Sequence, residues 1–452
     1  MPRALYPHQE QDALALAGSK NFLLAHGMRV GKTNTAIRAA DLIQADSVLW
    51  LTPGAGRIGH GCAWRDFQLK DRPVQVILDG RTQPIKNGAV ITSYALATGP
   101  LAPWLLAREW DLLVNDESHR LASQSAQRTK FVYGAQCRGE DGSLVAQARY
   151  RWNLSGTPAP KDVSQLWPML RALLPETIAH PSTKRPMGRW DFINRYCMTR
   201  DNGFGRVVVG NKKARLPELR AKMAPFMLRR TLEEFAPGPR FMDMPISNPR
   251  VYADLVDTEA ALIKQGLLDD LRNARSTEVK QALLDRMDSS LKAKLRLLGG
   301  LAAVLPVSEI VKEEIEDGLQ KIVIFAWHRE VIAKLAAELS VHGALILMGG
   351  SAPTEKERIR RAFMEDPARM VLVAQIEAAG EAIDLSVSDD IIFAEQDWVP
   401  GMNAQAAYRC SNTGKPRSVS VRTAILQESP VMKAIQEALA WRSAELAMLW
   451  GK

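Results

Sequence analysis

The sequence has few cysteines and no long apolar run. Its four cysteines, Cys62, Cys137, Cys197 and Cys410, lie far apart and form no Cys-x-x-Cys pair, which argues against zinc ligation and a disulfide framework. No run approaches the ~18 apolar residues that cross a bilayer, and the first residues lack the apolar core of a targeting segment. We therefore expect a protein of a reducing cytosol that is not embedded in a membrane.

The composition favours a soluble chain with more than one core. At 452 residues and 46% hydrophobic content, the chain suits two lobes of roughly 200 residues each. Lys and Arg exceed Asp and Glu by 59 to 50, which gives a net charge of +9. This excess favours contact with polyanions such as nucleic acid, although many soluble proteins share it.

Short apolar runs alternate with amphipathic stretches, a pattern typical of α/β proteins. The expected strands cover residues 21–25, 47–51, 74–78, 89–92, 111–114, 321–325, 345–347, 370–373 and 390–393. Pro237-Gly238-Pro239 interrupts the chain between the two series. We predict a first lobe over residues 1–236 with a helical protrusion from about 160 to 236, a linker and helical arm over 237–300, and a second lobe over 301–452.

A glycine turn before Lys32 and Thr33 lies between an expected strand, 21–25, and an expected helix, 33–45. Backbone N–H groups and an ammonium in such a turn suit phosphate oxygens, and a threonine hydroxyl suits Mg²⁺. The strict phosphate-loop spacing has glycine where His26 stands, so the segment alone is also compatible with an ordinary turn.

Two adjacent carboxylates follow the buried strand at 111–114. In open α/β sheets the carboxyl ends of the strands line the ligand crevice, so Asp116 and Glu117 are placed to meet phosphates. Asp116 suits a magnesium ion, and Glu117 suits deprotonation of the attacking water. His119 either senses the γ-phosphate or caps the turn.

Together these segments resemble the helicase-like ATPases of superfamily 2, and within them the Swi/Snf-type group of double-stranded DNA translocases. The resembling segments of the first lobe are 6–9, 28–33, 51–53 with Trp64, 91–94, 116–121, 154–158, 192–197 and 227–230. Those of the second lobe are 324–326, 349–351, 375–380, 382–385, and 398–400 leading to Gln405. The residues of these segments are most similar to those of the annealing-helicase, or HARP-related, subgroup. The resemblance implies two tandem RecA-like (P-loop) lobes with helical insertions.

The resemblance also implies a role for individual residues. The expected nucleotide site comprises Gln9, Met28, Arg29, Val30, Gly31, Lys32, Thr33, Gly380, Asp384, Gln405 and Arg409. The expected catalytic residues are Lys32, Asp116, Glu117, His119 and Arg409, with Thr33 and Asp116 on Mg²⁺. Ser155, Gly156 and Thr157 are expected to couple ATP to DNA, which Arg57, Ser93, Tyr94, Gly350 and Ser351 would contact. We expect Trp50, Trp152 and Trp167 to pack in cores.

Two residues depart from the family pattern. Arg29 stands where the family has glycine, which adds a cation beside the phosphates and restricts the turn. The family carries a second arginine three residues after Arg409, where Asn412 stands here. An arginine finger is typically worth about 10³–10⁵ in kcat. Its loss would either slow turnover or be covered by Lys415, Arg417 or Arg422.

The implied function is an ATP- and Mg²⁺-dependent motor that tracks along double-stranded or branched DNA, with single-stranded DNA as a further substrate. We expect a monomer inside the cell, of a minimal form similar to phage or bacterial members. One alternative is a strand-separating DNA or RNA helicase. Another is a nucleotide-gated DNA clamp with weak turnover.

Overall fold

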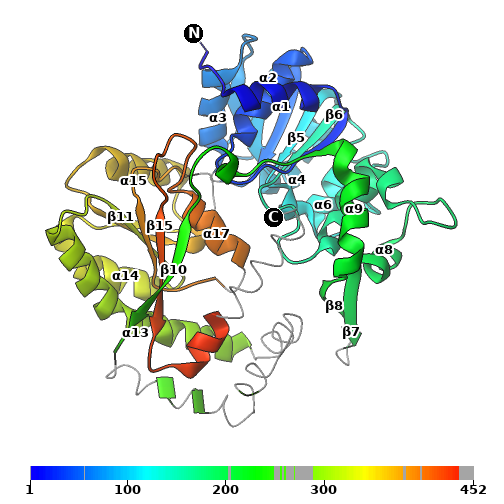
Figure 1. The fold of residues 1–452 in the computed structure, drawn as a ribbon. Helices are drawn as coiled ribbons and strands as arrows, with labels where there is room; N and C mark the ends of the chain where they lie inside the picture. Colours follow the sequence, from blue (N-terminus) through cyan, green and yellow to red (C-terminus); the bar gives the residue numbers. More distant parts are fainter. Residues whose placement is uncertain are drawn as a thin grey trace. The chain divides into compact units, whose positions relative to one another are not determined.

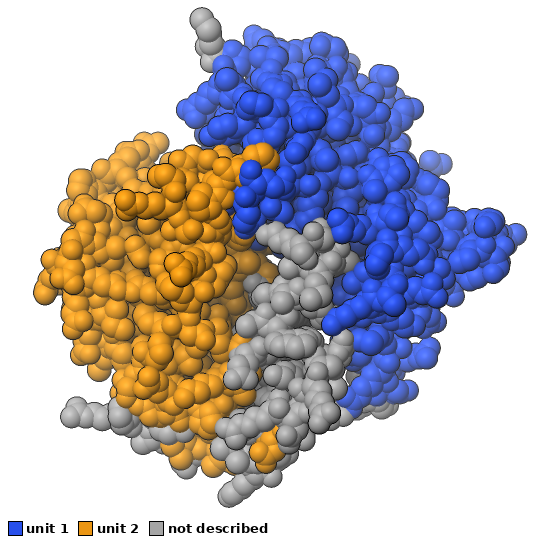
Figure 2. Space-filling view, viewed as in Figure 1, with its two compact units in different colours: residues 1–234 blue, residues 235–452 orange. Residues whose placement is uncertain are grey.

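The computed structural model describes residues 2–54, 56–201, 205–248, 255–256, 259–260, 269, 289–379, 383–397 and 400–436. The chain divides into two compact units, Met1–Glu234 and Phe235–Lys452, which Figure 2 draws in two colours. None of the helices among these described residues is long and apolar enough to span a membrane. Each unit is built around its own parallel sheet (Figure 1).

The sheet of the first unit is parallel throughout its described strands. Its order is β3 (Val74–Val76), β4 (Gly88–Ser93), β2 (Ser47–Thr52), β5 (Trp110–Asp116), β6 (Ala148–Leu154), β1 (Asn21–Leu24) and β9 (Met227–Leu228). The helices beside it are α1 (Pro7–Ala17), α2 (Lys32–Leu42), α3 (Gly56–Phe67), α4 (Tyr94–Thr98), α5 (Ala102–Leu106) and α6 (Gln127–Tyr133). Alternate strand residues such as Phe22, Trp50 and Val114 pack against α1, α2 and α3.

A helical insertion separates β6 from β9. It contains α7 (Trp167–Leu173), α8 (Arg189–Tyr196), α9 (Leu216–Met223) and an antiparallel hairpin of β7 (Cys197–Asp201) and β8 (Arg206–Asn211). In Figure 1 the hairpin points away from the sheet of the first unit. Trp50, Trp152 and Trp167 are buried, which confirms their predicted place in cores.

The second unit has a parallel sheet that is covered on both faces. Its described order is β10 (Arg240–Ile246), β15 (Ser420–Leu426), β14 (Asp390–Phe393), β11 (Ile322–Ala326), β13 (Val371–Gln375) and β12 (Leu345–Leu347). Its helices are α13 (Ser289–Glu316), α14 (Arg329–Glu338), α15 (Pro353–Glu365), α16 (Ile376–Ala379) and α17 (Pro400–Tyr408). Ile324 packs with α13 and α14, while its neighbour Phe325 packs with α15 and α17.

These two units confirm the predicted α/β class with two tandem RecA-like lobes. One segment differs from the prediction. β10 lies inside the segment assigned to a linker, 237–300, yet it pairs along its whole length with β15 and belongs to the second sheet. The expected helical arm lies largely outside the described residues. The strand is hard to recognise because it is a half-exposed edge strand that contains Pro245.

Candidate nucleotide site

The glycine turn that the sequence predicts to be a phosphate loop joins the end of β1 to the start of α2. Gly31 precedes the helix with a φ of 92°, and a Cβ built on it would lie 1.9 Å from the Gln9 side-chain nitrogen. A side chain at this position would be strained by the positive φ, and the Gln9 amide would have to move to make room for it. Arg29 has a φ of 64°, also in the left-handed region, which costs an L-residue about 1–2 kcal/mol. The family's glycine at that place therefore has a backbone reason, and Arg29 adopts the same conformation at a cost.

Gln9 lies against this loop from α1. Its Nε2 donates a hydrogen bond to the Val30 carbonyl at 3.2 Å, and its Oε1 accepts one from the Tyr6 backbone N–H at 3.2 Å. The side chain is 3% exposed. The structure thus brings Gln9 to the loop that the sequence pairs it with, across 21 residues of chain.

Lys32 is the first residue of α2 and lies beside the predicted coupling motif. Its Nζ donates to the carbonyls of His26 at 3.1 Å and Gly27 at 3.0 Å. A Cβ built on Gly156 would lie 3.4 Å from this Nζ and 3.3 Å from the Met28 Cγ. The turn after β6 therefore approaches the phosphate loop closely because Gly156 has no side chain. Thr33 follows in the first turn of α2.

The two carboxylates at the end of β5 have different surroundings. Asp116 is buried, and its Oδ2 accepts hydrogen bonds from Thr52 Oγ1 and His60 Nε2, each at 2.9 Å. Glu117 follows with a φ of 48°, a left-handed conformation that turns the chain sharply after the strand. The two side chains therefore leave the strand end in different directions.

His119 connects the acidic pair to the turn after β6. Its Nδ1 lies 3.2 Å from Glu117 Oε2 and 3.1 Å from Ser155 Oγ. The Ser155 Oγ in turn accepts the backbone N–H of Thr157 at 3.2 Å. Because β5 and β6 are neighbours in the sheet, their carboxyl ends place these groups side by side. This arrangement gives a contact path from Glu117 to the predicted coupling residues.

Three residues predicted to contact DNA have contacts that favour structural roles. The Arg57 guanidinium donates to the carbonyls of Gly54, Ile77 and Leu78 and is 9% exposed. Ser93 Oγ caps α4 by accepting the backbone N–H of Leu96.

Tyr94 is also buried, and its hydroxyl donates to the Asp116 carbonyl at 2.7 Å. Burial raises the pKa of this phenol, with the Asp116 charge adding to the effect. The sequence suggested contacts with DNA because Ser93 and Tyr94 lie in a segment that resembles a DNA-contacting motif of the family, and because Arg57 follows another such segment. Their burial, and that of Arg57, became visible only in the fold.

In the second unit the predicted residues gather around the loops after β12, β13 and β14. Gly350 and Ser351 follow β12, where the Gly349 N–H donates to Gln375 Oε1 at 2.9 Å. Gly380 lies outside the described residues. Asp384 Oδ1 accepts the Ser386 N–H, and the next residue, Leu385, donates its N–H to the Arg409 carbonyl at 3.0 Å. Gln405 lies buried on α17, in the turn before Arg409. The segments around Asp384 and Arg409 are thus joined by a backbone hydrogen bond.

Two of the cations that could replace the missing second arginine are engaged within the second unit. Lys415 Nζ donates to the Ser388 carbonyl at 2.7 Å and pairs with Asp389. Arg422 lies on β15 and pairs with Glu314 on α13.

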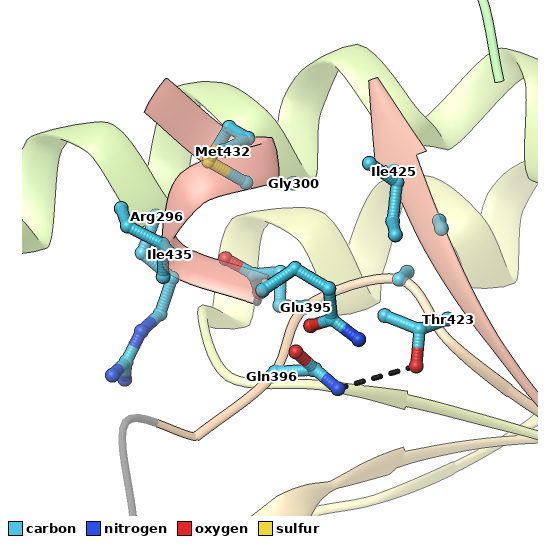
Figure 3. A pocket seen from close by; sticks show the side chains of 11 residues that line it. Arg296, Gly300, Glu395, Gln396, Thr423, Ile425, Met432 and Ile435 are labelled. Carbon is cyan, nitrogen blue, oxygen red and sulfur yellow. Dashed lines mark hydrogen bonds between the residues drawn. The ribbon is translucent and has the colours of Figure 1, made fainter. Parts of the chain in front are cut away.

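A pocket in the second unit contains none of the predicted site residues (Figure 3). It lies between α13, the residues after β14, β15 and residues 430–436. Arg296, Glu395 and Met432 line it, and Gln396 Nε2 donates to Thr423 Oγ1. The Glu395 carboxylate accepts the backbone N–H groups of residues 327 and 328 at 2.8 Å each, so this group fastens the end of β11.

His60 and Asp12 are important residues that sequence reasoning did not place at the site. His60 follows the segment 51–53 in the sequence and is buried against Asp116. Asp12 lies on α1 and contacts His26, the residue that replaces the phosphate-loop glycine. A signal existed for the second pair, since a buried histidine in a glycine position needs a partner.

The comparison with known families supports the class that the motifs predict, an ATPase of helicase superfamily 2. Residues 67–238 match the family model described as SNF2-related domain. This match agrees with the Swi/Snf-type group that the motifs predict, and it supports a nucleic-acid-dependent ATPase.

Several named relatives align with most of this chain. A Drosophila melanogaster protein named SWI/SNF-related matrix-associated actin-dependent regulator of chromatin subfamily A-like protein 1 is 24% identical, over 92% of this chain and 52% of its own length. The DNA annealing helicase and endonuclease ZRANB3 of Bos taurus is 25% identical, over 92% of this chain and 38% of its own length. The chain thus spans about half or less of these relatives. The Sulfolobus solfataricus SWI2/SNF2 ATPase core in complex with dsDNA is 18% identical, with a TM-score of 0.44 over 100% of this chain and 96% of that one.

Proposed function

We propose that this protein is an ATP-driven motor that tracks along duplex DNA. The observation that carries the proposal is the convergence of three segments at neighbouring strand ends of the first sheet. The phosphate loop follows β1, the acidic pair ends β5, and the coupling turn follows β6. Ligands of open α/β sheets bind at such carboxyl ends.

The residues present fit ATP with Mg²⁺. Gly31 and Gly156 leave space that a Cβ would fill, and the N-terminus of α2 favours an anion. A threonine hydroxyl and a carboxylate, Thr33 and Asp116, are oxygen donors of the kind that Mg²⁺ prefers. Hydrolysis of bound ATP would supply the free energy for movement along DNA.

Each site residue of the first unit has a specific role in this proposal. Lys32 exchanges its two carbonyl partners for phosphate oxygens, and Gln9 reads the adenine beside the loop. Glu117 accepts a proton from the attacking water as a general base. His119, which contacts both Glu117 and Ser155, reports the state of the phosphate site to the coupling turn.

The second unit would supply Arg409 as the finger, so turnover requires closure of the two lobes. Glu117→Gln tests the base, and Lys32→Ala tests the loop. We expect Lys32→Ala to abolish hydrolysis while it leaves the melting temperature nearly unchanged, because its ammonium is bonded to loop carbonyls and is not part of a hydrophobic core.

Duplex DNA is the proposed track for two reasons. The motif sequences resemble those of duplex DNA translocases, and the name of one relative describes an enzyme that acts on DNA. Contacts to a DNA backbone are mainly electrostatic, so binding should weaken steeply with salt and depend little on sequence. The test compares ATPase stimulation by duplex DNA, single-stranded DNA and single-stranded RNA. Equal or stronger stimulation by RNA would favour a strand-separating helicase instead.

A nucleotide-gated clamp is a second candidate, which the surroundings of Asn412 favour. Its side chain accepts the Gly414 N–H, and the neighbouring Lys415 and Arg422 already pair with carboxylates of their own unit. We expect Arg409→Ala to lower kcat strongly with little change in ATP affinity. A wild-type protein that is inactive with every nucleic acid, but is activated by Asn412→Arg, would favour the nucleotide-gated DNA clamp over the motor.

A further inference from the structure

The residue that replaces the phosphate-loop glycine is the centre of a buried polar network. His26 Nε2 lies 2.9 Å from Asp12 Oδ2, and both side chains are at most 1% exposed. Arg230 completes the network from the end of the first unit, since its Nε and Nη2 donate to the two Asp12 oxygens at 2.7 and 2.8 Å. The three residues come from α1, the phosphate loop and the segment after β9.

The hydrogen bonds determine where the imidazole proton lies. The Arg230 backbone N–H donates to His26 Nδ1 at 3.1 Å, so Nδ1 carries a lone pair. A carboxylate only accepts, so the proton lies on Nε2 and is donated to Asp12. Burial lowers the pKa of His26, and the charges of Lys32 and Arg230 lower it further against the opposing effect of Asp12. The imidazole is therefore neutral, with both nitrogens used.

The same segment holds the backbone of the loop. The Gly27 N–H donates to the Arg230 carbonyl at 2.7 Å, and the Ala25 N–H donates to the Leu228 carbonyl at 2.8 Å. Arg229 Nη1 donates to the Ala25 carbonyl at 3.0 Å. These bonds continue the parallel pairing of β1 with β9 beyond the strands. The next backbone groups along the loop are the carbonyls of His26 and Gly27, which accept hydrogen bonds from Lys32.

We propose that Asp12, His26 and Arg230 form a clamp that positions the phosphate loop, so that His26 secures by side-chain bonds the loop path that a glycine leaves to the backbone alone. The clamp ties the loop to the last segment of the first unit, since Arg230 shortly precedes its end at Glu234. These are positioning residues, and their role rests on the proposed function, which places phosphates at this loop.

Two substitutions of His26 each remove one bond. His26→Gln keeps a donor near the place of Nε2 and loses the acceptor for the Arg230 N–H. His26→Asn keeps an acceptor near the place of Nδ1 and loses the donor to Asp12. Misplacement of a binding group by about 1 Å can cost 10²-fold. We expect each variant to lower kcat/KM for ATP by about 10–100-fold, mainly through KM, because the residues that activate water are untouched.

His180→Gln is the matched control. His180 Nδ1 also accepts backbone N–H groups, from Ser182 and Thr183, but in the helical insertion away from the phosphate loop. Its KM should equal that of the wild type. Nucleotide affinity, measured with a fluorescent ATP analogue, and the melting temperature are recorded for every variant.

Arg230→Lys covers the case in which a His26 variant does not fold. The Arg230 side chain is 24% exposed, and the lysine keeps the positive charge. We expect it to raise KM for ATP as well, and a cycle with His26→Gln to be non-additive in kcat/KM. The proposed Asp12–His26–Arg230 clamp would be overturned if the folded His26 variants had a wild-type KM for ATP and only a lower melting temperature. It would also be overturned by a wild-type KM in Arg230→Lys, or by effects on kcat/KM that simply add in the double variant.

Lys32→Ala in the same assays separates this proposal from the proposed function. Lost turnover in Lys32→Ala with wild-type KM in the clamp variants would refute the clamp alone. Undiminished ATP turnover in Lys32→Ala would refute the phosphate site itself, and the clamp with it.

Discussion

His60 is the residue through which the assignment of Asp116 is tested most directly. Its Nε2 donates to Asp116 Oδ2 at 2.9 Å, with side chains that are 7% and 8% exposed. Gly56 makes this contact possible, because a Cβ on it would lie 3.3 Å from the imidazole and 2.8 Å from Thr52 Oγ1. His60→Ala removes one of the two side-chain donors and leaves Thr52 as the other.

The size of the effect follows from the charge of the acceptor. A hydrogen bond to a charged group contributes about 1.5–3 kcal/mol, so His60→Ala should lower the free energy of unfolding by that amount. Groups that orient a metal-binding carboxylate typically change metal affinity or activity by about 10–100-fold. If Asp116 holds Mg²⁺, the variant should need about 10-fold more Mg²⁺ for half-maximal ATPase activity.

The assay is an ATPase titration with Mg²⁺ at saturating ATP and duplex DNA. His60→Gln should recover much of the Mg²⁺ dependence, because its amide nitrogen can reach the place of Nε2. Cys62→Ser, an exposed change on the same helix, should behave as the wild type. A His60→Ala variant with lower stability but wild-type Mg²⁺ dependence and turnover would show that His60 only supports the fold, and would weaken the case for Asp116.

Three further predictions concern turnover and stability. Glu117→Gln should bind ATP with near-wild-type affinity in equilibrium binding yet hydrolyse it at least 10²-fold more slowly, because it removes the base; near-normal turnover would exclude this role. Arg72→Met should lower the unfolding free energy in urea by about 3–5 kcal/mol, because it leaves a buried aspartate unpaired; a loss under 1 kcal/mol would contradict this. Burial by itself would raise the pKa of Glu218. Hydrogen bonds from Arg195, Lys222 and Tyr196 outweigh this effect and lower the pKa to about 2. Its stabilisation should be complete above about pH 4.5 and decline as the pH falls toward 2, so the melting temperatures of wild type and Glu218→Gln should converge in acid; a pH-independent difference would refute the ion-pair explanation.

Strongly patterned elements were predictable from the sequence, and weakly patterned ones were not. The runs that became β1, β2, β5 and β11 are continuous and apolar, because both faces of a parallel sheet are buried. β6 gave no such signal, since Arg149, Arg151 and Asn153 interrupt it. In the fold Arg151 donates to the Val145 carbonyl, and Asn153 is held by Asn115 and Tyr133. Partners distant in the sequence thus made a polar segment into a central strand.

The sequence by itself determined the order of the motifs, the glycine turn before Lys32 and the position of Asp116 at a strand end. These depend on local chemistry, namely apolar runs, glycine and the residue types that bind phosphate. Only the tertiary structure decided which of these groups meet. His119 contacts Ser155 because β5 and β6 are neighbours, and His60 reaches Asp116 because Gly56 leaves room for it. Strand order and side-chain packing are set by the whole sheet, so no single segment of the chain specifies them.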